Sequence, residues 1–262
     1  MSNLVTRIIT GIVFIISVVA SLYFDPVIAA ALFSFFTYTG CKEYFRIAFE
    51  EKVNIKTELY AILIGAFVFL NTYLSSNAFS LMLGLIISII FGIEIASSKK
   101  MDWNKSVHAL IPLLWLGIPF AIFIGFLSDH QFGFKHALAI LVGVWSNDSM
   151  AYVTGRMLGR NKFAPTISPN KTWEGVIGGV VFAAAAMVLL FPDVSWYLAA
   201  LIGATVGLGS TIGDLVQSFW KRSVGIKDSG KIFPGHGGVL DRFDGFIFAV
   251  PVAVSLFYFF KL

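Results

Sequence analysis

The sequence predicts an all-α, polytopic integral membrane protein with about nine transmembrane helices and a cytoplasmic N-terminus. Of its 262 residues, 57% are apolar and only 13% are charged, whereas a soluble domain carries about 25% charged residues. Apolar runs such as 8–24 and 182–191 contain no charged residue. A helix needs roughly 20 mostly apolar residues to cross the hydrocarbon core of a bilayer. The solvent around most of this chain is therefore lipid.

The apolar runs, separated by turn residues and charges, define nine candidate spans. They cover about residues 5–24, 27–47, 58–74, 78–97, 107–127, 136–155, 174–191, 196–219 and 243–260. Short turn sequences such as Asp25-Pro26 and Pro192-Asp193 join spans on one side. An odd number of spans places the two termini on opposite sides of the membrane.

The distribution of positive charge supports this count. When the loops are assigned alternately to the two sides, seventeen of the nineteen Lys and Arg residues fall on one side, and only Lys135 and Lys261 fall on the other. Cytoplasmic loops carry the excess of Lys and Arg. If one helix were omitted, every later loop would change sides and the uneven distribution of charge would be lost. The N-terminus lies on the side rich in Lys and Arg, so it is predicted to be cytoplasmic.

We expect two parts in the chain. Residues 1–130 hold about five spans, and residues 131–262 hold about four spans with cytoplasmic loops at 156–173 and 220–242. The connections on the other side are too short to build a site. The single cysteine, Cys41, excludes an intrachain disulfide and a cysteine-based metal cluster.

Two acidic residues lie deep within predicted spans. Asp148 precedes Arg156 by eight residues and Asp214 precedes Lys221 by seven, which places both carboxylates roughly 10–12 Å inside their helices. A charged side chain inside a span costs about 2.5–3.5 kcal/mol or more, so it should face a cavity, a partner or a metal. Their common depth predicts one shared cavity, the alternative being that each pairs with a nearby cation.

Other acidic residues have simpler interpretations. Four glutamates alternate along the sequence with four basic residues, which indicates solvated ion pairs without a functional role; they are Glu43, Glu50, Glu51 and Glu58, with Lys42, Arg46, Lys52 and Lys56. Glu94 lies five residues before Lys99, near the end of its span. Two interpretations of Glu94 stay equally open: its side chain extends toward the membrane surface, or it has a functional role.

The last cytoplasmic loop has the densest chemistry. Five cations fall within 221–242, beside the glycine-rich turn 235–238, and the backbone amides of such a turn can approach a phosphate closely. Asp241 and Asp244 follow at i and i+3, on one face of a helical start whose dipole favours anions. Cations mixed with carboxylates suit phosphoryl or nucleotidyl transfer with Mg²⁺, since the ligands are hard oxygens. Binding of anionic lipid headgroups explains Lys221 and Arg222 equally well, but it does not explain the carboxylates.

The segment 167–179 is a second cytoplasmic feature. Ser168-Pro169 is interpreted as a helix start, with Lys171 beside the seventh span. Gly175, Gly178 and Gly179 are interpreted as allowing close helix packing.

Together these motifs resemble the phosphatidate cytidylyltransferase family, also called CDP-diacylglycerol synthases. The residues that stand at the spacing of the family signature are Ser218, Lys221, Arg222, Lys227, Asp228, His236, Gly237, Gly238, Asp241, Arg242 and Asp244. Further support comes from Asp148, Ala151, Tyr152, Gly155, Arg156, Ser168, Pro169, Lys171, Thr172, Trp173, Glu174, Gly175, Gly213, Asp214 and Leu215. The resemblance covers about residues 145–245. Four positions depart from the pattern, namely Met150, Asn170, Gln217 and Gly245. The neutral Gln217 puts a charged role there in doubt, although an amide oxygen can coordinate a hard cation.

The resemblance implies that phosphatidic acid attacks the α-phosphorus of CTP and yields CDP-diacylglycerol and pyrophosphate, with Mg²⁺ required and a second metal ion left open. It implies metal binding near Asp214 and Asp241, to which we add Asp148 or Asp244. We assign catalytic roles to Lys171, Lys221, Arg222 and His236. We assign substrate binding to Arg156, Ser168, Lys227, Lys231, Gly237, Gly238 and Arg242. His236 is interpreted as a donor rather than a base, because an ionised phosphate oxygen needs no base to attack.

The expected partners are CTP, phosphatidic acid and membrane lipids, with no nucleic acid, and a homodimer is expected from the frequency of symmetric oligomers. The expected location is the cytoplasmic (inner) membrane, as a multi-pass protein with its active site facing the cytoplasm. Two alternatives stay open. One is a CTP-dependent enzyme that acts on another membrane lipid, and the other is an ion-coupled transporter whose cation path is lined by Asp148 and Asp214.

Overall fold

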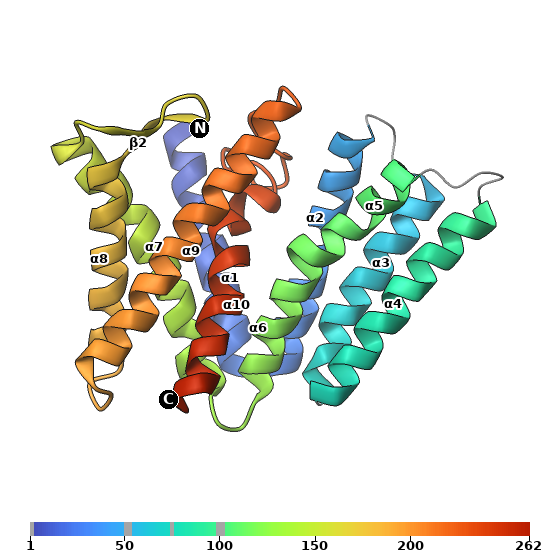
Figure 1. The fold of residues 1–262 in the computed structure, drawn as a ribbon, viewed down its shortest axis with the longest axis horizontal. Helices are drawn as coiled ribbons and strands as arrows, with labels where there is room; N and C mark the ends of the chain where they lie inside the picture. The colour runs from blue at the N-terminus through green and yellow to red at the C-terminus, as the bar shows by residue number, and fades with distance from the viewer. Residues whose placement is uncertain (1–2, 50–53, 74–75, 98–102) are drawn as a thin grey trace. The chain divides into compact units, whose positions relative to one another are not determined.

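The structure, a computed structural model, describes residues 3–49, 54–73, 76–97 and 103–262, and it is built almost entirely of helices (Figure 1). The elements in chain order are α1 (Asn3–Phe24), α2 (Pro26–Ala48), α3 (Ile55–Leu70), η1 (Asn71–Tyr73), α4 (Ser76–Ser97), α5 (Trp103–Pro112), η2 (Leu113–Gly117), α6 (Ile118–Ser128), α7 (Gly133–Leu158), β1 (Lys162–Ala164), β2 (Ser168–Thr172), α8 (Trp173–Leu190), α9 (Trp196–Ser223) and α10 (Leu240–Phe260). Each of the nine predicted spans coincides with helical structure. The prediction of an all-α fold is therefore confirmed.

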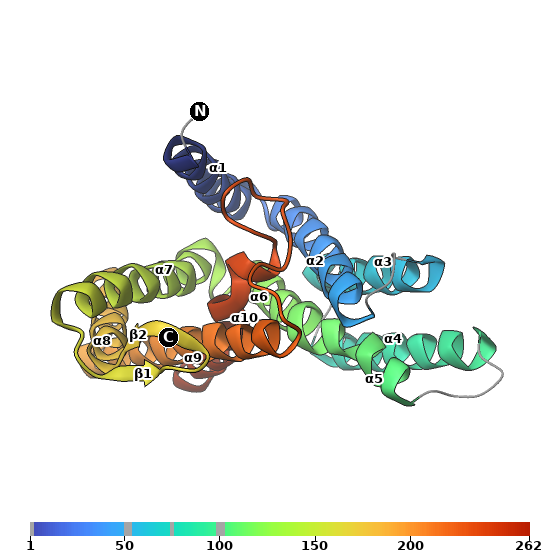
Figure 2. The ribbon, with the colours of Figure 1, turned by 90° about the horizontal axis from the view of Figure 1, so that it is seen from above.

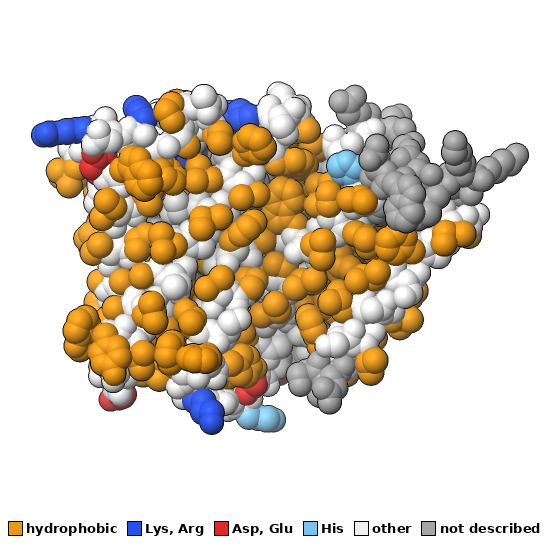
Figure 3. Space-filling view, in the orientation of Figure 1, with side chains coloured by type: hydrophobic (Ala, Val, Ile, Leu, Met, Phe, Trp, Pro, Cys, Tyr) orange, Lys and Arg blue, Asp and Glu red, His pale blue; other side chains and the backbone are white. Residues whose placement is uncertain are grey.

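Within the described residues, seven helical segments are long and apolar enough to cross a membrane. The two predicted spans outside this set are α2 and α7, which carry more polar residues. On the face shown in Figure 3, hydrophobic side chains cover the sides of the helices, and the Lys and Arg side chains lie near helix ends. The chain is thus a multi-pass membrane protein. The number of crossings and the side of the N-terminus stay predictions, and Lys99 and Lys100, part of the charge count, lie outside the described residues.

The chain forms two compact units. The first comprises Met1–Asp129 and Asp228–Arg242, and the second comprises His130–Lys227 and Phe243–Leu262. The segment 228–242 therefore packs with the N-terminal helices, although in sequence it lies between two helices of the other unit. The assignment of catalysis to residues 131–262 stays a prediction.

Glycines bring the helices of the second unit into backbone contact. A Cβ added to Gly203 of α9 would lie 2.4 Å from the carbonyl oxygen of Ala183 in α8. A Cβ added to Gly175 of α8 would lie 2.8 Å from the carbonyl oxygen of Ala151 in α7. Small residues at helix interfaces allow this approach, which in lipid supplies much of the packing energy. The packing role predicted for the glycines of α8 is confirmed.

A two-stranded hairpin joins α7 to α8. β1 and β2 pair antiparallel, with Lys162 opposite Thr172 and Ala164 opposite Ser168. The prediction that Ser168-Pro169 starts a helix is wrong, because α8 starts only at Trp173. Thr172 is the N-cap, and its hydroxyl accepts a hydrogen bond of 3.2 Å from the Gly175 amide. The first turn of a helix has backbone amides without intrahelical partners. A threonine cap gives one of them a hydrogen-bond acceptor, whereas a proline in the first turn has no amide hydrogen to satisfy.

The predicted span 107–127 in the first unit is one helical path with an irregular centre. A π-helical turn over Leu113–Gly117 joins α5 to α6. Pro112 and Pro119 flank this turn. A proline within a helix removes one backbone hydrogen bond and clashes with the preceding turn, and a local widening accommodates it.

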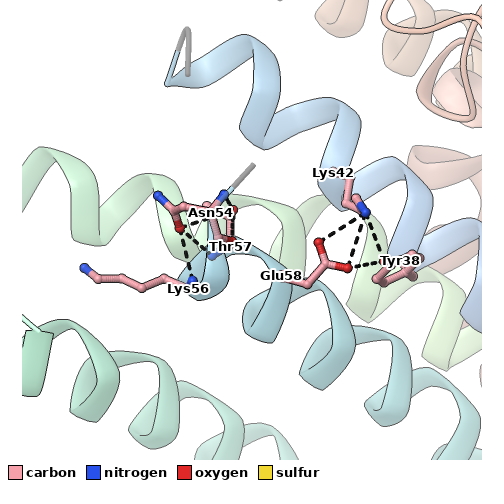
Figure 4. A network of polar contacts seen from close by, with 6 residues as sticks. All are labelled: Tyr38, Lys42, Asn54, Lys56, Thr57 and Glu58. Carbon is pink, nitrogen blue, oxygen red and sulfur yellow. Dashed lines mark hydrogen bonds and ion pairs between the residues drawn. The ribbon is translucent and has the colours of Figure 1, made fainter. Parts of the chain in front are cut away.

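The C-terminal end of α2 and the N-terminal end of α3 carry the ion pairs predicted for this region only in part, and Glu50, Glu51 and Lys52 lie outside the described residues. Lys42 Nζ lies 3.1 Å from Glu58 Oε2, and the Tyr38 hydroxyl also donates to Glu58 (Figure 4). Asn54 caps α3 by accepting hydrogen bonds from the amides of Lys56 and Thr57 in a capping box (Figure 4).

Two further acidic residues of the first unit are buried. The solvated pairing predicted for Glu43 is wrong, because Glu43 is only 6% exposed and its partners are backbone amides and a serine. Glu94, also buried, accepts a hydrogen bond of 2.6 Å from the Tyr60 hydroxyl and pairs with Lys56.

The glycine contacts of the second unit yield a stability prediction. Replacing Gly203 by Ala forces α8 and α9 apart and should cost roughly 1–3 kcal/mol, which lowers the unfolding temperature in detergent by several degrees. Gly84→Ala in α4 is the matched control, since an added methyl there meets nothing within 4 Å. Equal unfolding temperatures for the two variants would contradict the packing role.

Candidate functional site

A polar stripe runs along the last turns of α9 in the second unit. Ser210, Asp214, Ser218 and Lys221 recur at intervals of three or four residues, which places them on one face of the helix. Ser218 Oγ donates to Asp214 Oδ1 at 3.1 Å. Lys171 Nζ of β2 lies 2.7 Å from Asp214 Oδ2. The Asp214 side chain keeps 36% of its surface exposed, so it is held in place and still accessible.

Two more carboxylates lie near Asp214 in the same unit. Asp148 of α7 accepts a hydrogen bond of 3.0 Å from Ser210 Oγ. Asp244 of α10 accepts one of 2.8 Å from the Gly245 amide. Asp148 and Asp244 interact electrostatically with each other and with Asp214. These three residues are named the acid cluster. The common depth predicted for Asp148 and Asp214 thus corresponds to proximity in the structure.

Glycines explain why α9 and α10 approach at this point. A Cβ added to Gly213 would lie 2.2 Å from the Asp244 carbonyl oxygen, and one added to Gly245 would lie 2.3 Å from Ser210 Oγ. Gly245 is one of the positions that depart from the family signature, and in this chain its lack of a side chain makes room for Ser210. Close backbone contact brings the carboxylates of neighbouring helices together.

Two buried polar side chains border the acid cluster. Lys221, only 9% exposed, interacts electrostatically with Asp244. Gln217 is fully buried, and neither its amide nitrogen nor its amide oxygen has a hydrogen-bond partner among the described residues. A buried polar atom without a partner costs about 1–3 kcal/mol, so its retention suggests a bound ligand or water.

The donor set of the acid cluster suits a hard divalent cation. Three carboxyl groups lie near two lysines, Lys171 and Lys221. Mg²⁺ prefers carboxylate oxygens and retains several waters. No group of three His, Cys, Asp or Glu side chains in the described ranges has the spacing of a complete metal site. The acid cluster offers suitable oxygen atoms but is not by itself a complete metal site, so Mg²⁺ binding there stays a prediction.

The loop between α9 and α10 contributes a second group of predicted residues, which belongs to the first unit from Asp228 to Arg242. Phe233-Pro234-Gly235-His236 forms a turn in which the His236 amide donates to the Phe233 carbonyl at 2.8 Å. Pro at the second position and Gly235, with a φ of 75°, at the third are typical of a type II turn. Gly237 also has a positive φ, of 83°.

The backbone amides at the start of α10 donate hydrogen bonds to carboxylates of the protein itself. The sequence predicts instead that amides of this region bind a phosphate. Asp241 Oδ2 accepts hydrogen bonds from the amides of Ser229 and Gly238 at 2.7 and 2.9 Å. Glu43 accepts from the amides of Val239 and Leu240 at 3.0 and 3.1 Å. The amides of residues 238–240 are thus already engaged. Phosphate binding in this loop would depend on side chains rather than on these amides.

His236 lies beside α1. Its Nδ1 is 2.8 Å from Thr10 Oγ1, and Arg7 packs against the adjacent Gly235. Desolvation, followed by the positive charges of Arg242 and Arg7, lowers the pKa of His236 below its ordinary value. These surroundings favour the neutral imidazole, and the interpretation of His236 as a hydrogen-bond donor to substrate stays a prediction.

The remaining predicted residues lie at exposed or half-exposed positions. Arg222 donates to the Ile226 carbonyl at 2.8 Å, and Arg156 donates to the Tyr152 hydroxyl at 3.1 Å. Lys227, Lys231 and Arg242 are exposed, and Ser168 is half-buried at the start of β2. Nothing in these contacts assigns a ligand to any of them, so their substrate-binding roles stay predictions.

Comparison with known proteins identifies the family. The sequence matches the model of the cytidylyltransferase family over residues 5–260. The chain belongs to this family. Similar proteins include the phosphatidate cytidylyltransferases of Staphylococcus haemolyticus, 38% identical over 168 residues, and of Staphylococcus aureus, 39% identical over 169 residues. Each alignment covers 63% of this chain and 64% of the relative. The resemblance seen in the signature residues is confirmed at the level of the family.

Several residues of this cytidylyltransferase-family site were not predicted. Ser210 and Asn147 hold Asp148, with Asn147 Nδ2 at 3.3 Å from its carboxylate. Ser210 lies one turn before Asp214 on the same face of α9, so helical spacing could have indicated it. Glu43 and Thr10, in contrast, lie more than 180 residues from the loop that they contact, and no local pattern links them to it.

The charges around His236 yield a testable pKa shift. Arg7→Gln removes one of the two positive charges that disfavour the imidazolium, so the pKa of His236 should rise. The measurement is an NMR titration of the imidazole in detergent micelles. Arg46→Gln, which changes an exposed arginine on α2, is the control. An unchanged or lower pKa in the Arg7→Gln protein would contradict the placement of Arg7.

Proposed function

We propose that this protein transfers CMP from CTP to phosphatidic acid, giving CDP-diacylglycerol and pyrophosphate. The observation that carries the proposal is the assembly of signature residues in one unit. Asp148, Lys171, Asp214, Lys221 and Asp244 come from three helices and a strand, and they form one cluster of opposite charges. Family membership and the names of the relatives support the same reaction.

In the proposed reaction an ionised oxygen of the lipid phosphate attacks the α-phosphorus of CTP. A new phosphorus–oxygen bond forms, and the bond from the α-phosphorus to the oxygen that bridges to the β-phosphorus breaks, so that pyrophosphate leaves with that oxygen. No proton has to be removed from the nucleophile. The protein's main task is therefore to bring two anionic substrates together and to stabilise the charge that develops on the leaving group.

The acid cluster is the proposed site of Mg²⁺, with Asp214 central and Asp148 and Asp244 beside it. Bound Mg²⁺ would neutralise phosphate oxygens and orient the triphosphate. Asp241, which belongs to the other unit, is likewise proposed as a metal ligand, and a second metal ion stays within the proposal. Lys171 and Lys221 hold positive charge against the cluster, where they can bind substrate phosphates without a large rearrangement. Ser218 and Ser210 fix the orientation of the Asp214 and Asp148 carboxylates.

The predicted orientation belongs to the same proposal. We propose that the active site faces the cytoplasm from the inner membrane, where CTP is available, and that the protein forms a homodimer. Arg222, Lys227, Lys231, Arg242, Arg156 and Ser168 are proposed to bind substrate phosphates, and Gly237 and Gly238 to let a substrate approach the loop. His236 is proposed as a neutral donor.

Removal of the Asp214 charge should abolish most activity. Asp214→Asn keeps the size of the side chain but weakens cation binding and the ion pair with Lys171, so turnover should fall by roughly 100-fold or more. The control is Asp25→Asn, because Asp25 caps α2 at an exposed position and asparagine can cap equally well. Near-normal turnover of the purified Asp214→Asn protein at saturating Mg²⁺ would refute the assignment.

A turnover assay with labelled CTP tests the reaction itself. Pyrophosphate release with phosphatidic acid, and labelled CDP-diacylglycerol as product, is the expected outcome. A panel of other lipid phosphates and lipid alcohols should give much lower rates. Preference for another lipid would replace the proposed substrate, and the absence of CTP turnover with every lipid would refute the enzymatic function.

A further inference from the structure

Glu43 is a buried carboxylate of α2 that the proposed reaction does not use. It is 6% exposed and lies on a helix whose neighbouring residues Cys41, Tyr44 and Phe45 are also buried. Its Oε1 accepts a hydrogen bond from the Val239 amide, and its Oε2 accepts from the Leu240 amide and from Ser229 Oγ. Both oxygens are therefore used to hold a loop almost two hundred residues further along the chain.

The contacts of Glu43 continue to Asp241. Ser229 Oγ lies 3.0 Å from Glu43 Oε2 and 3.0 Å from Asp241 Oδ2, and the Ser229 amide donates to the same Asp241 oxygen. Asp241 Oδ2 also accepts from the Gly238 amide. Two carboxylates thus share one serine and engage three consecutive amides, 238–240, at the start of α10.

Apolar contacts hold the same loop against α1 and α2. Val239 is fully buried, and a Cβ added to Gly40 of α2 would lie 3.5 Å from it. The Phe233 ring meets the rings of Phe14 and Phe36, with centroids 5.3 and 6.2 Å away. Figure 2 shows the loop beside α1 and α2. The burial removes competing water, which strengthens the hydrogen bonds to Glu43.

We propose that Glu43 is a positioning residue for the reaction. From α2 it caps the start of α10, and through Ser229 it fixes Asp241 and the turn that carries His236. The inference rests on the proposed function, because it assigns Glu43 its role through the loop residues of that reaction. Glu43 does not touch substrate. The α2 carboxylate supplies the anion that the helix start requires, so the loop keeps one conformation before any substrate binds.

The test compares two matched substitutions. Glu43→Gln preserves size but turns one oxygen into an NH₂ group, which must face a donor amide or hydroxyl. Glu58→Gln makes the same change on α3, where Glu58 pairs with Lys42 and does not contact the loop. We expect the Glu43→Gln protein to lose at least about tenfold in kcat, with a smaller change in the KM for phosphatidic acid. The Glu58→Gln protein should stay within about twofold of the unaltered protein.

A double-mutant cycle separates positioning from general destabilisation. Ser229→Ala removes the hydroxyl shared by Glu43 and Asp241, so its effect on kcat should be smaller in the Glu43→Gln protein than in the unaltered protein. When Ser229→Ala is combined with Glu58→Gln, the fold-change in kcat should equal the product of the two separate fold-changes. Independent effects in both pairs would overturn the proposal, as would near-normal kcat for Glu43→Gln.

Hydrogen–deuterium exchange provides a measurement that does not depend on activity. The amides of Val239 and Leu240 should exchange at least about tenfold faster in the Glu43→Gln protein, whereas amides in α3 should not change. Unchanged exchange at these two amides, or equally faster exchange throughout α3, would overturn the proposal. If the unaltered protein failed to turn over CTP, the proposed function would fall, but exchange would still show whether Glu43 holds the loop.

Discussion

Charged groups in a lipid-embedded protein need partners from the protein itself, and this requirement governs the arrangement of both units. In water a carboxylate exchanges one set of hydrogen bonds for another at little cost, but inside apolar helices it must find donors or cations. Asp148 finds Ser210, Asp214 finds Lys171 and Ser218, and Glu43 finds the start of α10. The apolar helices provide the surroundings, and the few polar residues determine where helices and loops meet.

The two units meet this requirement in different ways. In the second unit, glycines at positions such as 203 and 213 let the backbones approach, and carboxylates from separate helices come close together. Their repulsion is offset by Lys171 and Lys221. In the first unit, carboxylates instead satisfy backbone amides at a helix start, so their charge serves to fix a conformation. The same chemical group thus gathers beside lysines in the second unit and accepts hydrogen bonds from backbone amides in the first.

Most of the fold could be predicted because lipid imposes long apolar helices whose limits are visible as charges and turn residues. The proximity of Asp148 and Asp214 was predictable for a related reason, since helical rise converts sequence spacing into depth. The hairpin before α8 was not, because Ser168-Pro169 resembles a helix start, and only the cap by Thr172 shows where α8 begins. The role of Glu43 was hidden for a stronger reason. The basic residues Lys42 and Arg46 lie close to it in sequence, whereas its hydrogen-bond partners are residues 229, 239 and 240, a relationship that depends on tertiary structure alone.

The attachment of residues 228–242 to α1 and α2 has a consequence for biosynthesis. Helices α1 and α2 leave the ribosome well before this loop and α10 do. Until then the Glu43 carboxylate has none of its final donors, and it must stay hydrated near the membrane surface or bind transiently elsewhere. Docking of this later segment onto α1 and α2 therefore replaces water around the Glu43 carboxylate by backbone amide groups.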